Sequence, residues 1–526
     1  MMFITSPRLL ALPVSWIVAA SFITRETPAK NITTCNNQVY EYETLAGYGK
    51  LPSNVRDKYG DTVGGIGSAI ALEPKSWKFG GDSYTGVIYG LPDRGWNTQG
   101  TQNTQSRIHK FYVTFTPAEA TIETPASPNL SIVYNDTILL YGPDSTPLTG
   151  LDTTGRAQYP GFPDLLIAQY TGDGFGGKGE GGSRISLDSE GLVLKDGNFW
   201  ISDEYAAYIY EFDPEGKMKS ATPTPDAVTP QRNGTDSFNA ASPPIYDPTY
   251  TTTPENPTSG RSNNQGLEAL TSSPGGEYMY TMLQSATVQD GGTSSKNRRN
   301  TRLFVYKTFE DTMELEAEYA VQLPVLPNEK VAVQSEMHYI SPTQFLVLAR
   351  DSNAGRGQKS SESLYRSVDV IDISNATNLV NQTGVNDIGG QIASCKGKLK
   401  KDIQPAEYCP WLSFNDNAQL GKFGLHNGGT QDVNLLNEKW ESLALLPVDE
   451  DDSIGRSAAS SKNETAGRQF SLISFSDNDF ITQDDNVAGY INSGQNQYAD
   501  ASGFDIDIQA LVFKVKVPSA MSSTED

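Results

Sequence analysis

The chain has 526 residues and a formal net charge of −23, a length that fits one large all-β unit or two to three ordinary domains. The acidic balance argues against a nucleic-acid partner and against docking on anionic lipid. Three cysteines and three histidines are too few for a Cys/His zinc framework. We therefore expect neither nucleic-acid binding nor membrane insertion.

Residues 1–20 have the pattern of a signal peptide. Arg8 gives a basic start, an apolar run follows from Leu9, and the run ends on the small residues Ala19 and Ala20. The run is short for a membrane span, although a signal anchor is the alternative. We predict a soluble, secreted, extracellular protein, and we expect it to be a monomer.

Sequons and cysteines agree with secretion. In an oxidising compartment we expect Cys395 and Cys409, which lie in one polar stretch, to pair and to leave Cys35 over. The alternative is three free buried thiols. The sequence predicts glycosylation at seven Asn-x-Ser/Thr sites: Asn31, Asn129, Asn135, Asn233, Asn375, Asn381 and Asn463.

Short β-rich runs alternate with Gly, Pro, Asn and Asp along the whole chain, from TGVIYGL (85–91) to LVFKVKV (511–517). Many short strands with frequent turns predict a sandwich, a barrel or a propeller. The best helical candidate, residues 308–320, can equally be an edge strand. Residues 221–263 and 449–468 read as long loop insertions.

A repeated two-strand plan favours the propeller. Five segments share a strand, a tight turn, a second strand and an acidic or polar end, and four of them carry a Glu at a matched position: Glu190, Glu268, Glu336 and Glu441. Repeated β-meanders of this size predict an all-β propeller of six or seven blades with long loop insertions. A large two-sheet sandwich is the alternative. We expect an N-terminal segment at 21–59, the propeller at 60–517 and a tail at 518–526.

The hairpins predict where acidic side chains meet. Asp196-Gly197 is a strong two-residue turn, and pairing about its centre puts Glu190 opposite Asp203, with Glu204 adjacent. The same reasoning, with less defined registers, places Glu268 near Gln284, Glu336 near Asp351, and Glu441 near Asp477 and Asp479. Asp93 ends the second strand of the first copy.

Equivalent positions of the blades of a propeller converge at the axis, so these carboxylates are expected to form a ring at one mouth. Like charges a few ångströms apart repel, and a ligand set of oxygen atoms alone favours Ca²⁺ over zinc. A solvated turn residue is the alternative for any single acid. The predicted metal ligands are Glu190, Asp203, Glu204, Glu268, Glu336, Asp351, Glu441, Asp477 and Asp479.

Two arginines lie beside these acids in the sequence. Arg94 and Arg350 could each clamp a phosphate oxygen, or could instead pair with a neighbouring Asp. The three histidines, His109, His338 and His426, are scattered and are expected to be structural.

Several of these segments resemble a known family. The stretches WISDEYAAYIYEFDPEG, NQGLEAL, SEMHYI, LVLARD, NEKWESLAL and SDNDF are similar to the phytase-like domain called "esterase-like activity of phytase", especially in its secreted fungal members. The resemblance covers about residues 60–517. It implies a propeller-like fold and phosphoric-ester hydrolase activity tied to the Glu and Asp residues named above. Ala269 stands where members of the family often have Gly.

The sequence thus predicts a secreted, Ca²⁺-dependent hydrolase of small-molecule phosphate esters. The candidate catalytic residues are Glu190, Glu268, Glu336 and Glu441, with Arg94 and Arg350 on the substrate. Two alternatives stay open. One is a non-catalytic extracellular propeller that binds glycan or protein with structural calcium, and the other is a calcium lactonase or ester hydrolase.

Overall fold

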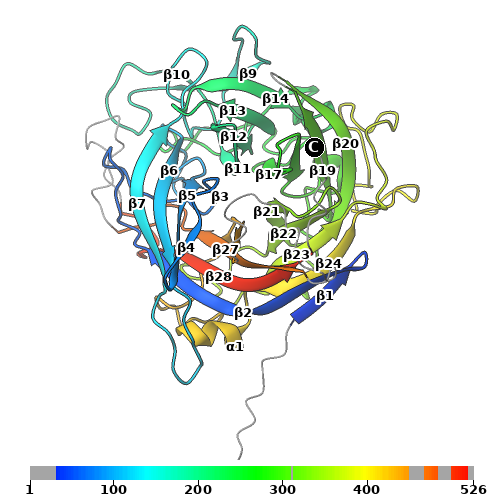
Figure 1. The fold of residues 1–526 in the computed structure, drawn as a ribbon. Helices are drawn as coiled ribbons and strands as arrows, with labels where there is room; N and C mark the ends of the chain where they lie inside the picture. Colours follow the sequence, from blue (N-terminus) through cyan, green and yellow to red (C-terminus); the bar gives the residue numbers. More distant parts are fainter. Residues whose placement is uncertain (1–30, 310–311, 449–466, 484–498, 519–526) are drawn as a thin grey trace, which may run out of the picture.

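A computed structural model describes residues 31–309, 312–448, 467–483 and 499–518. The predicted signal peptide, Asn463 and nearly all of the insertion at 449–468 therefore lie outside the described residues. Within them the chain is almost entirely strand and loop (Figure 1), which confirms the all-β prediction. The helical elements are α1 (Asn417–Leu420), η1 (Asp226–Val228), η2 (Val288–Asp290) and η3 (Gly421–Phe423).

Three antiparallel sheets have four strands each, in sequence order. Their hairpins follow the predicted turns: Asp196 and Gly197 both have positive φ, as a tight two-residue hairpin turn requires. The sheets are β11 (Ser189–Lys195), β12 (Asn198–Asp203), β13 (Tyr208–Phe212) and β14 (Met218–Pro223); β17 (Leu267–Ser272), β18 (Tyr278–Leu283), β19 (Asn300–Thr308) and β20 (Met313–Gln322); and β21 (Val333–Tyr339), β22 (Gln344–Arg350), β23 (Arg366–Asp372) and β24 (Glu407–Ser413).

The fourth large sheet has eleven strands and contains two more meanders, β3-β5-β6-β7 and β26-β27-β28-β2. They are joined where β2 and β7 pair in parallel at Gly49 and Leu130. The strands are β1 (Asn31–Cys35), β2 (Gln38–Leu51), β3 (Ala69–Leu72), β4 (Lys78–Gly80), β5 (Ser83–Leu91), β6 (Arg107–Phe115), β7 (Leu130–Leu139), β25 (Lys439–Trp440), β26 (Ala444–Pro447), β27 (Arg468–Asp477) and β28 (Ile508–Val517).

The N-terminal strands belong to this sheet. β2 pairs with β28 over most of its length, from Glu41 opposite Lys516 to Leu51 opposite Ile508. Residues 31–51 are therefore part of the fold, and the predicted boundary between residues 59 and 60 does not mark where the fold begins.

The sheets surround a common centre (Figure 1), and the first strands of successive meanders, β3, β11, β17 and β21, contact one another in turn. Neighbouring sheets pack through apolar side chains that alternate along the strands, as the two-residue period of a strand requires. On β12, Phe199 and Ile201 join a core with Leu91, whereas Trp200 joins a second core with Leu270. The hydrophobic core therefore lies between the sheets.

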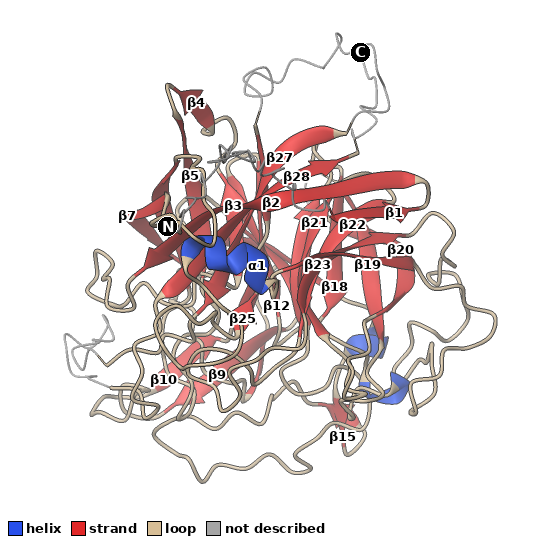
Figure 2. Cartoon of the chain, turned by 90° about the horizontal axis from the view of Figure 1, so that it is seen from below, coloured by secondary structure: helices blue, strands red, loops and turns tan. Residues whose placement is uncertain are grey.

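Shorter strands and long loops lie outside these sheets. Figure 2 shows that the long loops gather on one side, with β9, β10 and β15 among them. Residues 308–320 fall mainly in β20, the edge strand of its sheet, which settles the helix-or-strand alternative. The remaining strands are β8 (Gly155–Ala157), β9 (Leu165–Tyr170), β10 (Gly182–Ile185), β15 (Gln231–Arg232) and β16 (Thr235–Asp236).

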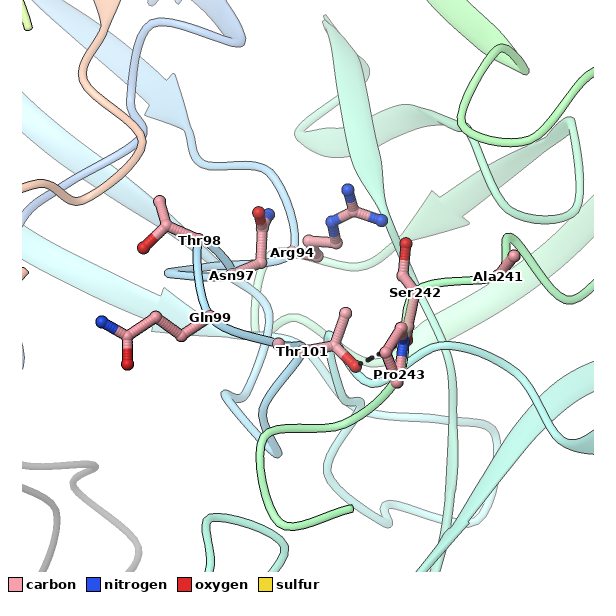
Figure 3. Close-up of a pocket in the computed structure, with 9 residues that line it drawn as sticks. Arg94, Asn97, Thr98, Gln99, Thr101, Ala241, Ser242 and Pro243 are labelled. Atoms are coloured by element: carbon pink, nitrogen blue, oxygen red, sulfur yellow. Dashed lines mark hydrogen bonds between the residues drawn. The ribbon is translucent and has the colours of Figure 1, made fainter. Parts of the chain in front are cut away.

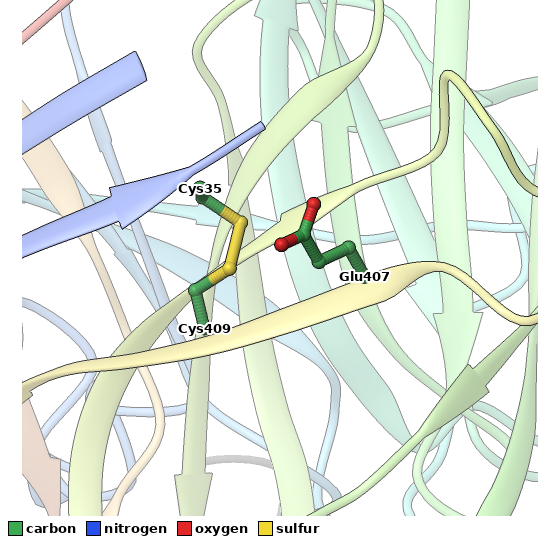
Figure 4. Close-up of side chains that lie close together, drawn as sticks. All are labelled: Cys35, Glu407 and Cys409. Atoms are coloured by element: carbon green, nitrogen blue, oxygen red, sulfur yellow. A yellow bond between two sulfur atoms is a disulfide. The ribbon is translucent and has the colours of Figure 1, made fainter. Parts of the chain in front are cut away.

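The disulfide differs from the predicted one. Cys35 pairs with Cys409 (Figure 4), with Cα atoms 5.8 Å apart, whereas Cys395 is free and exposed. The prediction of a Cys395–Cys409 bridge was wrong because it rested on closeness in sequence. β1 lies beside β24, so the two cysteines meet although 374 positions separate them.

The described sequons are not equivalent. Asn31, Asn135, Asn233, Asn375 and Asn381 are exposed. The amide of Asn129, in contrast, donates to the carbonyls of Ala46 and Thr116 and accepts from the Tyr48 N–H. A glycan on that nitrogen would remove one of these bonds, so Asn129 does not suit the predicted modification. Glycosylation at the exposed sequons stays a prediction.

Candidate functional site

Three of the predicted acidic residues, Glu190, Glu268 and Glu336, lie near the start of the first strand of their hairpins. In β11 the pairing runs in the expected register as far as Leu192 opposite Ile201, and then shifts so that Ser189, not Glu190, is opposite Asp203. A β-bulge at Glu190 and Gly191 causes the shift, because the extra residue moves the pairing by one position. The predicted Glu190–Asp203 pair was therefore wrong by one residue. The registers of β17 and β21 shift beside Glu268 and Glu336 in the same way.

These bulges help to build a buried group of charged side chains, which we call the central acidic cluster. Its carboxylates far outnumber its cations, Arg94, Arg350 and Lys439. At close range the repulsion within each pair of like charges costs about 1–4 kcal/mol when no cation compensates it. The carboxylates are Asp93, Asp188, Glu190, Glu204, Glu268, Glu441, Asp477 and Asp479.

One half of the cluster already holds a cation. Asp93, Asp477 and Asp479 lie together around the Lys439 ammonium, whose Nζ is 2.6 Å from Asp479, 3.1 Å from Asp477 and 3.9 Å from Asp93. Burial opposes the charge of Lys439, but the carboxylates of Asp479, Glu441 and Asp477 raise its pKa well above the ordinary value. Lys439 is therefore a fixed positive charge at this position.

The other half has acidic oxygens without partners. Oxygens of Asp188, Glu190 and Glu204 lie within 4.8 Å of one another. Glu204 Oε1 and Glu268 Oε2 are buried and have no hydrogen-bond partner among the described residues. Burial and the charge of Asp188 raise the pKa of Glu204 to about 8. Burial and the charge of Glu268 likewise raise the pKa of Glu190.

Arg94 connects this half to a surface pocket. Its Nη1 lies 3.2 Å from Asp188 Oδ2, its backbone N–H donates to Asp188 Oδ1, and the guanidinium lies over the Tyr205 ring. The pocket has a volume of about 350 Å³. Figure 3 shows the Arg94 side chain between the loop from Asn97 to Thr101 and the segment from Ala241 to Pro243. Among these lining residues Arg94 is the charged one.

The donor set fits a hard divalent cation. Ca²⁺ binds oxygen at about 2.3–2.6 Å, so oxygens on opposite sides of one ion are about 5 Å apart, as the spacing of Asp188, Glu190 and Glu204 allows. Two unpartnered carboxylate oxygens in a buried site indicate a missing positive charge. The residues therefore fit calcium at the half of the cluster that lacks Lys439.

Comparison with known proteins assigns the family. The family model "Phytase-like: Esterase-like activity of phytase" matches residues 63–480. This chain belongs to the phytase-like family. An uncharacterized secreted protein of Arthroderma benhamiae is 50% identical to the phytase-like chain over 472 residues, which cover 87% of this chain and 90% of that protein. Within the described residues of the phytase-like chain, no helix is long and apolar enough to cross a membrane.

Solved structures are only distantly similar to the phytase-like chain. A luciferin-regenerating enzyme matches with a TM-score of 0.27 and 9% identity over 90% of this chain and 97% of its own. The β-propeller domain of Cps50 (Swd1) from Myceliophteria thermophila matches with a TM-score of 0.18 and 8% identity over 61% of this chain and 96% of its own. At these TM-scores the matches carry no argument about fold or function.

Four predicted site residues of the phytase-like chain are held by other groups. Asp203 accepts backbone N–H bonds from Asp188, Tyr205 and Ala206, and so fixes the turn after β12. The remaining three have local partners: Glu336 accepts from the Met337 N–H, Asp351 from Ser363 Oγ and the Leu364 N–H, and Arg350 donates to Ser335 Oγ and Glu441. The structure thus brings Glu190, Glu204, Glu268, Glu441, Asp477 and Asp479 together, but not Asp351.

Sequence reasoning missed two residues of the central acidic cluster. Asp188 and Lys439 each lie two positions before a predicted Glu, at Glu190 and Glu441, and that closeness in sequence was the available signal. It also missed Arg261, which lies outside the cluster, donates to the carbonyls of Tyr205 and Phe238, and belongs to the stretch read as a surface insertion.

Proposed function

We propose that this phytase-like protein is a secreted phosphoric-ester hydrolase that acts on small-molecule phosphate esters at the central acidic cluster and depends on Ca²⁺. The observation that carries the proposal is the pair of buried, unpartnered oxygens, Glu204 Oε1 and Glu268 Oε2, of which Glu204 lies near Arg94. Membership of the family supports the reaction class. The relative named as a secreted protein supports the location.

Each side chain has a distinct part in the proposed reaction. Asp188, Glu190 and Glu204 would hold the calcium ion, and bound calcium would supply positive charge against the phosphate oxygens. Arg94 would bind a further phosphate oxygen from the pocket side.

Glu268 is our candidate proton donor. Burial and the charges of Glu204 and Glu441 raise its pKa well above the ordinary value, which favours its protonated form. It can pass that proton to the oxygen of the departing alcohol.

We infer that the meanders are the blades of a propeller. Three separate sheets and the two meanders of the large sheet give five blades among the described residues, fewer than the predicted six or seven. The contacts between β3, β11, β17 and β21 support an axis lined by the first strand of each blade. An experimental structure would test both the number and the axis.

Turnover with and without a chelator tests the proposed function. The purified protein is assayed on phosphate monoesters, phosphate diesters, lactones and aryl esters in excess Ca²⁺ or excess EDTA. We expect hydrolysis of a phosphate ester that EDTA abolishes and that added Ca²⁺ restores. Glu190→Gln should lose at least a hundredfold in kcat/KM while its far-ultraviolet circular dichroism is unchanged.

Glu211→Gln is the matched control. Glu211 is also a buried Glu of the same sheet, on β13. Its carboxylate accepts hydrogen bonds from Asn198 on β12 and Lys219 on β14. Full phosphate-ester turnover in EDTA would refute the calcium mechanism. Turnover of lactones or aryl esters alone would favour the lactonase alternative. No turnover together with saturable binding to cell-wall glycan would favour a non-catalytic propeller.

A further inference from the structure

Asp188 takes part in two sets of interactions at once. One of its oxygens, Oδ2, lies 3.2 Å from Arg94 Nη1, and its carboxylate also belongs to the group with Glu190 and Glu204. Asp188 is buried, with a relative exposure of 2%. A cation held by Asp188, Glu190 and Glu204 and the guanidinium of Arg94 therefore draw on the same negative charge.

Arg94 has donor capacity that the protein does not use. Its Nε is buried without a hydrogen-bond partner among the described residues, and its Nη1 contact to the Tyr205 hydroxyl is 3.4 Å long. Asp188 Oδ2 makes no hydrogen bond within the described residues, so it holds Arg94 by charge and leaves N–H donors for an oxyanion, which a guanidinium binds through two parallel N–H bonds. The affinity of Arg94 for an anion therefore depends on how strongly Asp188 holds it.

The pocket at Arg94 suits an anion. Asn97, Thr98, Gln99 and Ser242 supply neutral polar groups, and no carboxylate is among its lining residues in the described chain. The chain as a whole carries a charge of −23, so an anionic ligand needs a local site of this kind. A tetrahedral oxyanion such as phosphate matches an arginine surrounded by amide and hydroxyl groups.

We propose that Asp188 couples the cation site to a phosphate subsite formed by Arg94 and the loops at 97–101 and 241–243. Occupancy of the cation site neutralises Asp188 and weakens its hold on Arg94, so that the guanidinium turns to the anion. The coupling is reciprocal: phosphate on Arg94 leaves Asp188 to the cation, and each ligand raises the affinity for the other by the same factor. This inference rests on the proposed calcium site and adds ordered, cooperative binding to it.

Titration calorimetry with inorganic phosphate tests the coupling. The whole protein is titrated in EDTA and again in saturating Ca²⁺, and Ca²⁺ is titrated with and without phosphate. We expect Ca²⁺ to raise phosphate affinity at least tenfold, and phosphate to raise Ca²⁺ affinity by the same factor. In Asp188→Asn at saturating Ca²⁺ that ratio should fall severalfold, because Arg94 is free in both states and only the attraction of the ion itself for phosphate remains.

Two further variants make the result decisive. Glu211→Gln changes a buried carboxylate outside the central acidic cluster and should keep the tenfold ratio. Arg94→Gln should lose phosphate binding while still binding Ca²⁺. This variant tests the phosphate subsite if Asp188→Asn does not fold.

The possible failures can be told apart. Phosphate affinity that is equal with and without Ca²⁺, in a protein that binds Ca²⁺, would overturn the coupling and leave the proposed function standing. A full tenfold ratio in Asp188→Asn would mean that the attraction of the ion itself accounts for all of the coupling, and it would overturn the role of Asp188. Absence of Ca²⁺ binding in the wild type would overturn the proposed calcium site itself, and the coupling with it.

Discussion

Lys439 supplies from the chain the positive charge that Asp93, Asp477 and Asp479 require. Removing one partner of a buried charge group leaves the others unpaired. Because Lys439 keeps a quarter of its side-chain exposure, we expect Lys439→Met to lower the free energy of unfolding by about 2–3 kcal/mol at pH 7. Urea denaturation measures the loss.

Lys439→Arg is the control for this change, since it keeps the charge. The loss in Lys439→Met should shrink at pH 5, where Asp477, whose pKa burial raises to about 7, holds a proton. Equal stability of the Met and Arg variants at pH 7 would show that the ammonium is not needed there.

The calcium-free protein should become less stable as pH rises. Burial raises the pKa of Asp203 to about 7, of Asp477 to about 7 and of Glu204 to about 8. Above pH 4 the folded state therefore binds more protons than the unfolded state, and the free energy of unfolding falls with pH through about pH 8. Melting temperatures in EDTA between pH 5 and 8 measure this fall.

Calcium should flatten or reverse the pH dependence, because it binds the ionised carboxylates. Glu204→Gln, which has no charge to lose, should show a smaller fall than the wild type in EDTA. A melting temperature that rises with pH in EDTA would contradict the assignment of these groups as buried acids.

At the level of the strand, Gly191 allows the β11 bulge to approach β17. A Cβ on Gly191 would lie 2.5 Å from the Leu270 backbone N and 2.7 Å from Ser202 Oγ. Gly191→Ala should therefore push the two strands apart, with a loss of about 1–3 kcal/mol in stability and a loss of calcium affinity. Gly275→Ala is the control, because its Cβ would meet nothing within 4 Å. Calorimetry on both variants measures the change in stability and in calcium affinity.

The Cys35–Cys409 disulfide fastens β1 to β24. Replacing both cysteines with Ser should lower the free energy of unfolding by about 2–5 kcal/mol, because the bridge closes a very long loop in the unfolded chain. Cys395→Ser should have no effect, since Cys395 is exposed and unpaired. Denaturation with and without reductant measures the change, and a destabilised Cys395→Ser protein would contradict the pairing.

Local signals predicted the elements well and the contacts between them less well. The turn at Asp196-Gly197 fixed the β11–β12 hairpin, and the repeated Glu residues marked the strands that reach the centre. The bulge at Glu190 was missed although Gly191 follows it, and a glycine inside a strand often marks a bulge. The strand that Gly191 meets there, β17, is distant in sequence. Separation in sequence likewise left no local signal for the Cys35–Cys409 disulfide or for the ion pair of Asp188 with Arg94.

The net charge of the whole molecule should affect the rate at which it meets an anionic substrate. A net charge of −23 repels a dianionic ester over distances that low salt does not screen. We expect kcat/KM for such an ester to rise about two- to fivefold as NaCl increases from about 10 to 150 mM, at constant free Ca²⁺. A neutral aryl ester should show no comparable rise if it is a substrate. A fall with salt would show that attraction at Arg94 dominates the encounter.

The pairing of β2 with β28 has a consequence for biosynthesis. The ribosome makes Gln38–Leu51 long before Ile508–Val517, so the sheets between them can form while β2 still lacks its partner. An unpaired strand that persists through the synthesis of these sheets is open to wrong partners and to chaperones. Folding of this chain should therefore finish in one late step after β28 is made, and a truncation just before residue 508 should prevent that step.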